Sequence, residues 1–188
     1  LTACVMRRRL LRLRLAQLDV VAVHAVVADL ERRDAGRGLL AFFEIDEELI
    51  RSRVLSAIAA RKPLARRYDT DGVRLIFGEA DRLPGVLCDA FGKTAVLSCF
   101  SAGMQPFLPL IVETLAACGY TGIYERSVGD SRQKEGLPDT QGWRHGEATF
   151  PVPFHEGKAK FQVHPDRGQK TGFYLDFRLG RERFAELS

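Results

Sequence analysis

The sequence predicts an α+β fold in which a mixed sheet packs against helices. Two stretches, 44–61 and 105–118, carry apolar residues at helical spacing. Short runs with the alternation of half-buried strands lie between and after them, separated by turns rich in Gly, Pro and Asp. The order strand, strand, strand, helix, strand and closing hairpin therefore indicates a central α+β domain at about 67–165.

Composition limits the class of protein. A chain of 188 residues is long enough for one or two domains, and 46% hydrophobic with 28% charged residues is typical of a globular protein. The formal net charge of +4 suits a polyanionic partner, but many basic soluble proteins bind no polyanion. No apolar run is long enough to cross a membrane, so we expect a cytoplasmic protein without a membrane partner.

The four cysteines lie far apart in the sequence. None of them forms a Cys-x-x-Cys pair, and a zinc site would need closer ligand spacing. We therefore expect no metal, and we expect buried free thiols in a reducing compartment at Cys88, Cys99 and Cys118.

Residues 1–43 form a basic segment in which arginines alternate with leucines before the first acidic residue, Asp19. Three interpretations compete: an RNA-binding arm, a transit-like leader and a solvated charged face. The last is favoured because a charge run alone is not specific. The chain begins with Leu1 rather than methionine, which suggests a partial or reassigned reading frame.

Residues 44–66 are predicted to form a helix followed by a linker. Acidic residues occupy the first turn, where negative charge suits the helix dipole, and Pro63 is expected to end the helix. The linker is expected at 64–72. The apolar stripe of this helix consists of Ile50, Val54, Ala57 and Ile58.

The central domain is predicted to begin with strands at 73–77, 86–88 and 95–100, with a turn at 89–93. A helix at 105–118 and a strand at 122–127 follow. A polar loop is expected to continue through Gly142, and two further runs, 147–154 and 158–163, indicate a closing hairpin.

After the hairpin, residues 168–178 read Gly-Gln-Lys-Thr-Gly-Phe-Tyr-Leu-Asp-Phe-Arg at a strand-to-helix corner. Phe177, Phe184 and Leu187 recur at helical spacing, and Asp176 is a candidate cap for that helix. Such a corner can present backbone donors and a flat aromatic face to a small polar ligand. From the residues alone, a structural turn with core aromatics is the favoured alternative.

This stretch resembles the "GQKTGFYLDQR" signature of large-subunit ribosomal RNA cytosine-5 methyltransferases of the YccW type, which use S-adenosylmethionine. Ten of the eleven positions match, and Phe177 replaces the glutamine of the signature. The resemblance begins near Glu44. It includes residues 79–85, similar to the family's "EGDGLPG", and residues 124–127, which read "YERS" as in the family.

The resemblance implies that residues 166–188 begin a Rossmann-like α/β methyltransferase domain that is truncated, and that residues 1–43 are a degenerate remnant of the family's RNA-binding PUA barrel. No Gly-x-Gly-x-x-Gly cradle for the cofactor occurs. The family's nucleophilic cysteine lies far downstream, so we assign no catalytic residue and expect the chain alone to be inactive.

The resemblance also implies an auxiliary wall of the S-adenosylmethionine pocket and a ribosomal RNA partner. Arg126, Arg132 and Lys134 are the candidate phosphate contacts, although surface cations also serve solubility.

The alternative functions are a non-catalytic RNA-binding module and a dimerisation module that forms a homodimer. The candidate cofactor-binding residues are Gln169, Lys170, Thr171, Gly172, Phe173, Tyr174, Asp176 and Arg178.

Overall fold

A computed structural model describes residues 46–187, and the structural statements below refer to these residues. The expectations for residues 1–43 lie outside the described part of the chain. Helix α3 (Glu47–Arg67) opens the described part, and Asp46 caps it because its side chain accepts a hydrogen bond from the Leu49 amide at 2.8 Å.

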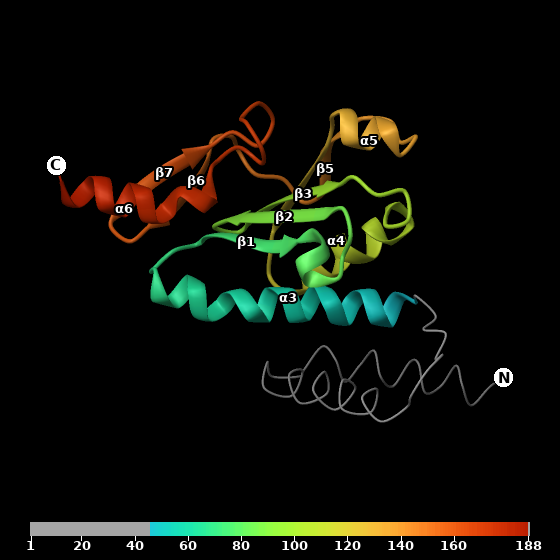
Figure 1. The fold of residues 1–188 in the computed structure, drawn as a ribbon, viewed down its shortest axis with the longest axis horizontal. Coiled ribbons are helices and arrows are strands. Elements are labelled where there is room, and N and C mark those ends of the chain that lie inside the picture. Colours follow the sequence, from blue (N-terminus) through green and yellow to red (C-terminus); the bar gives the residue numbers. More distant parts are fainter. Residues whose placement is uncertain (1–45, 188) are drawn as a thin grey trace, which may run out of the picture. The chain divides into compact units, whose positions relative to one another are not determined.

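Five strands form one mixed sheet in the order β1-β2-β3-β4-β5 (Figure 1). The first three strands form an antiparallel meander, β3 and β4 are parallel, and β5 returns antiparallel to β4. A parallel pair needs a crossover connection, which helix α4 (Leu108–Ala117) provides after a short 3-10 turn at Gln105–Phe107. The strands are β1 (Gly72–Phe77), β2 (Val86–Phe91), β3 (Thr94–Cys99), β4 (Gly122–Ser127) and β5 (Thr140–His145).

One face of the sheet packs on α3 and α4. The stripe of α3 contacts alternate residues of the strands, including Cys88, Leu97 and Ile123, and α4 adds Ile111 and Leu115. All of these side chains are buried, so this layer is the larger hydrophobic core.

The other face carries the hairpin and the corner. Strands β6 (Val152–Glu156) and β7 (Ala159–Val163) pair antiparallel across a tight turn at Gly157, and the 3-10 turn Leu175–Phe177 leads into helix α6 (Arg178–Glu186). A second, smaller core forms where Phe91 of the sheet meets Phe154, Val163 and Leu175. Figure 1 shows the hairpin and α6 on the side of the sheet opposite α3.

The α+β prediction is confirmed, but three of its elements differ. Helix α3 continues through Pro63 to Arg67, where a linker was expected. Pro63 lies on an exposed side of the helix, so water can pair with the carbonyl that loses its amide partner. Strand β2 continues through Asp89 and Phe91, where a turn was expected, and the turn contains only Gly92 and Lys93.

The expected polar loop between β4 and the hairpin is the third difference. It contains the short helix α5 (Asp130–Lys134) and the edge strand β5. Strand β5 is polar and half exposed because one side of it faces solvent, and its Trp143 packs against Tyr124 with ring centroids 5.2 Å apart. Its composition therefore lacked the apolar alternation on which strand prediction depends.

Candidate functional site

The corner after β7 is a tight loop whose backbone needs glycine. The Gly172 amide donates to the Gln169 carbonyl at 2.8 Å, and Gly172 has a φ of 113°. A Cβ atom at this position would lie 2.4 Å from Val163 Cγ2, so no other residue fits. Lys170 also adopts a left-handed conformation, with a φ of 52°, which is uncommon for a residue with a side chain.

Thr171 fixes this loop to the sheet. It is buried, and its hydroxyl donates to Asp89 Oδ2 at 2.5 Å. The same carboxylate accepts from Arg74 Nε at 2.8 Å and from Arg74 Nη2 at 3.0 Å. The hydrogen bond to Asp89 raises the pKa of Arg74, so the guanidinium stays charged at neutral pH. Thr171 is therefore an anchor of the corner, not an exposed ligand of a cofactor.

The two adjacent aromatics have different environments. Phe173 is half-buried and packs against Phe154 and Phe161, with ring centroids 4.8 and 5.1 Å away. Tyr174 is 43% exposed, and Lys170 Nζ lies 4.2 Å from the centroid of its ring. Phe173 is therefore a core residue, whereas Tyr174 offers an open aromatic face.

A shallow hollow of about 360 Å³ opens beside this face, lined by Lys170, Tyr174, Asp176 and Phe177. Lys170 Nζ donates to Asp176 Oδ2 at 2.9 Å, and this hydrogen bond lowers the pKa of Asp176, so the carboxylate is ionised at neutral pH. The hollow thus combines two aromatic rings with one cation and one anion.

Arg178 does not face this hollow. Its Nε donates to Glu156 Oε1 at 3.1 Å and its Nη2 to the Gly72 carbonyl at 2.6 Å, and its side chain is 12% exposed. Arg178 is therefore bound within the fold in this structure, and its expected contact with a cofactor stays a prediction. The expected cap is wrong: Asp176 does not cap α6, whose N-cap residue Phe177 has no side-chain cap bond.

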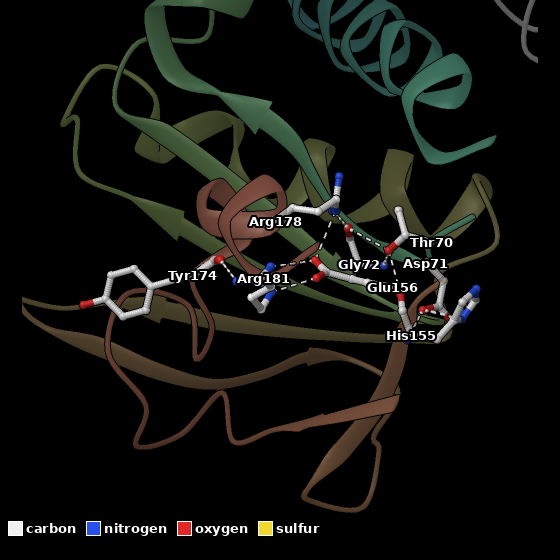
Figure 2. Close-up of polar contacts among 8 residues, drawn as sticks. All are labelled: Thr70, Asp71, Gly72, His155, Glu156, Tyr174, Arg178 and Arg181. Carbon is white, nitrogen blue, oxygen red and sulfur yellow. Dashed lines mark hydrogen bonds and ion pairs between the residues drawn. The ribbon is translucent and has the colours of Figure 1, made fainter. Parts of the chain in front are cut away.

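Glu156 and Arg181, which the sequence analysis missed, complete this anchor. Arg181 donates to both oxygens of Glu156 at 2.8 Å and to the Tyr174 carbonyl at 2.7 Å. Figure 2 shows Arg178 and Arg181 converging on Glu156 while the Tyr174 ring points away from them. The hairpin therefore holds α6 and the backbone of Tyr174 through one carboxylate. A lone Glu at the end of a strand gives no sequence signal for such a role.

A wider open hollow of about 760 Å³ lies along the hairpin, and its lining includes Lys158, Lys160 and Phe161. On its rim, Asp71 Oδ1 accepts from the His155 amide at 2.7 Å and lies 3.0 Å from His155 Nδ1 (Figure 2). Asp71 thereby fixes the imidazole and ties the start of β1 to β6.

Of the three candidate RNA contacts, only Lys134 is fully exposed. Arg126 is half-buried and donates from Nη1 to the Pro165 carbonyl at 3.2 Å. Arg132 is 1% exposed and donates to the Cys99 carbonyl, the Pro138 carbonyl and the side chains of Gln105 and Thr140. The expectation that Arg132 is a surface cation is therefore wrong, because α5 turns it inward.

The cysteines of the described chain offer no activated thiolate. Cys88 and Cys99 are buried as expected, and burial raises the pKa of both thiols. Cys118 is exposed, which corrects the expectation of a buried thiol there.

Among residues 46–187, no three His, Cys, Asp or Glu side chains are grouped to hold a metal ion. In the same residues, no helix is long and apolar enough to cross a membrane.

Comparisons with known proteins support the resemblance. No family model matches the chain. It is 40% identical over 147 residues to ribosomal RNA large subunit methyltransferase I of Shewanella amazonensis, covering 76% of this chain and 37% of that protein. It is also 40% identical over 141 residues to the protein of the same name in Aliivibrio fischeri, covering 74% of this chain and 36% of the relative.

The chain spans about a third of the length of these curated relatives. A solved structure described as "a putative methyltransferase complexed with SAH" superposes with a TM-score of 0.61 at 20% identity, covering 74% of this chain and 35% of that one. At this identity the superposition establishes a shared fold. The homologues are thus ribosomal RNA large subunit methyltransferases, and the fold matches a chain described as a methyltransferase.

Proposed function

We propose that this chain is part of an S-adenosylmethionine-dependent methyltransferase that modifies carbon 5 of cytosine in ribosomal RNA. The observation that carries the proposal is the corner at residues 168–178. It bears the family signature and leaves Lys170, Tyr174, Asp176 and Phe177 around an open hollow. Relatives that are 40% identical to this chain over 147 and 141 residues are ribosomal RNA large subunit methyltransferases.

S-adenosylmethionine supplies an electrophilic methyl group and carries both an adenine ring and an amino-acid end. The hollow fits parts of such a molecule: the exposed Tyr174 ring offers a surface for an apolar or cationic group, and Lys170 and Asp176 offer partners for a carboxylate and an ammonium. Gln169 is exposed beside Tyr174, and its side-chain oxygen accepts from the Tyr174 hydroxyl, which orients the ring. These residues would form one wall of the pocket.

We also propose that residues 1–188 alone do not catalyse the reaction. Methylation at carbon 5 of cytosine needs a cysteine thiolate that adds to carbon 6, and a base that later removes the proton from carbon 5. Desolvation raises the pKa of the Cys88, Cys99 and Cys118 thiols, and no glycine-rich cofactor cradle occurs in the sequence. Catalysis therefore requires elements that these residues do not supply.

Titration calorimetry tests this part of the proposal. We expect the 188-residue chain to show no micromolar affinity for S-adenosylmethionine, because a single wall leaves most of the ligand in solvent. Micromolar binding would show that the chain contains a complete cofactor site and would overturn the proposal of an inactive part.

A chimera tests the methyltransferase assignment itself. In the Shewanella amazonensis relative, the 147-residue aligned stretch would be replaced by the matching stretch of this chain, and transfer of a labelled methyl group to unmodified ribosomal RNA would be measured. We expect activity that falls at least tenfold with Tyr174→Ala or Lys170→Ala. The matched control, Arg183→Ala, removes an exposed cation of α6 that pairs with Glu186 and should leave activity unchanged. Equal activity in all variants would exclude the corner from the site.

A dimerisation module is the second candidate function, and the exposed apolar residues of the C-terminal region favour it. Phe177, Leu179, Phe184 and Leu187 are 62–74% exposed, although α6 is amphipathic in sequence. An apolar surface of this kind commonly marks a protein interface.

A further inference from the structure

The most completely buried charge near the corner is Asp89, in the middle of β2. Its side chain has no exposure to solvent, and it accepts three hydrogen bonds: two from Arg74 and one from the Thr171 hydroxyl. Thr171 is 82 residues away in the sequence. One carboxylate therefore joins two neighbouring strands to the loop that carries the candidate ligand residues.

Stability alone gives a weak reason for a charge at this position. Moving a carboxylate out of water costs several kcal/mol, and a buried ion pair often contributes no more to stability than apolar residues of similar volume. The neighbouring residue on the same face of β2, Phe91, shows that this face of the sheet accepts apolar side chains. A buried carboxylate does give directional bonds, which fix the positions of the groups that donate to it.

The loop needs such an anchor. Thr171 is the only buried residue between Gly168 and Tyr174. It lies between two residues with positive φ, Lys170 at 52° and Gly172 at 113°. The left-handed conformation of Lys170 costs about 1 kcal/mol, and such a conformation persists only where its surroundings hold it.

The orientation of Lys170 depends on this conformation. Its ammonium lies 4.2 Å from the centroid of the Tyr174 ring and 2.9 Å from Asp176 Oδ2, so the cation, the ring and the anion are arranged around one hollow. Releasing Thr171 would let the Lys170 backbone relax and would move the ammonium away from the ring.

We propose that Asp89 is a positioning residue that holds the corner, through Thr171, in the shape that forms the ligand hollow. The identity of the ligand rests on the proposed function, whereas the positioning role does not. Asp89 contacts neither the hollow nor its lining residues, and it acts through the Thr171 hydroxyl.

Nuclear magnetic resonance of the 188-residue chain tests this role without a ligand. Because the Lys170 ammonium lies 4.2 Å from the centroid of the Tyr174 ring, we expect the ring to shift the ε-methylene protons of Lys170 upfield, and this shift would report the contact between them. We expect Thr171→Val to move the signal towards the position of an exposed lysine, because valine keeps the shape but cannot donate to Asp89. Thr171→Ser keeps the hydroxyl and should restore the upfield shift.

Asp89→Asn is the second variant, in which a neutral amide replaces one acceptor oxygen. It should also reduce the upfield shift. If this variant does not fold, Thr171→Val still decides the matter, because it leaves the Asp89–Arg74 pair in place. An unchanged Lys170 signal in folded Thr171→Val would overturn the proposal. Failure of methyl transfer in the chimera, with the Lys170 signal lost in Thr171→Val as expected here, would reject only the proposed function.

Discussion

At the residue scale, charged side chains inside the described chain are paired, and each pair joins distant segments. Glu125, on β4, is fully buried and accepts from Arg144 Nε of β5, while its Oε1 atom has no partner among the described residues. Arg132 joins α5 to the end of β3 and to Thr140, the first residue of β5. Since a buried charge without a partner is strongly unfavourable, these residues define which segments must pack together.

Glu156 gives the most direct test of such a pair. Glu156→Ala would leave Arg178 and Arg181 without their shared carboxylate, and we expect the free energy of unfolding to fall by about 2 kcal/mol. The estimate lies below the range for fully buried pairs because Arg181 is 22% exposed. Urea unfolding of the chain measures this change. Glu156→Gln keeps the shape and one acceptor oxygen and should lose less, and equal losses in both variants would show that the carboxylate charge accounts for the whole effect and the packing of the side chain for none of it.

The cysteines give a second prediction at this scale. Cys88 and Cys99 are buried, and burial raises the pKa of each thiol, so little thiolate is present near neutral pH. We expect iodoacetamide at pH 8 to modify exposed Cys118 before either of them, as followed by peptide mass spectrometry. In urea all three should react at similar rates. Rapid alkylation of Cys88 or Cys99 in the folded chain would contradict their assignment as structural thiols.

At the element scale, the sequence predicted the elements whose apolar residues have a clear period. Helix α4, the meander strands and the β6–β7 hairpin were found because their buried side chains alternate or recur at helical spacing. The stripe of α3 was also correct, since all four of its residues are buried. The prediction that Pro63 ends α3 was wrong. Pro63 lies on an exposed side of the helix, where water can pair with the carbonyl that loses its amide partner, so the helix continues past it.

Polar residues with distant partners were not predictable in this way. The sequence placed Asp89 in a turn. In the structure Asp89 is a buried residue of β2, because Arg74 and Thr171 donate hydrogen bonds to its carboxylate. Arg132 indicated a surface cation, yet acceptors from three other segments bury it. The signature at 168–178 lies at a corner between β7 and α6, and its role as a site stays a prediction; its division into anchors and exposed residues depends on Asp89 and Glu156.

Helix α6 tests the dimerisation function. Its apolar spacing was correctly interpreted as helical, but Phe177 and Leu187 are 63% and 74% exposed. Because exposed apolar surface favours association, we expect the weight-average mass of the chain to rise with concentration in sedimentation equilibrium. The double variant Phe177→Gln, Leu187→Gln should remain monomeric. The control Leu64→Gln changes an exposed leucine of α3 and should still associate. A monomeric wild-type chain at all concentrations would reject self-association.

At the scale of the whole molecule, the net charge of +4 favours contact with RNA, but the basic groups differ in their availability. Lys134 is exposed at the end of α5, Arg126 has one of its N–H groups bound to the Pro165 carbonyl, and Arg132 is enclosed. If the chain contacts ribosomal RNA through the loop after β4, Lys134 is therefore the side chain best placed to meet a phosphate.

Salt dependence of binding measures this contact, because each neutralised phosphate releases counterions. We expect Lys134→Ala to lower the slope of log K against log salt for a structured RNA by about 0.7 to 0.9, the contribution of one phosphate contact. Lys134→Arg keeps the charge and should keep the slope, so it separates the loss of a cation from a change in folding. An unchanged slope in Lys134→Ala would place the RNA interface elsewhere. The Arg126→Ala variant tests the adjoining end of β4 in the same way, since the Arg126 guanidinium retains N–H groups that the Pro165 carbonyl does not bind.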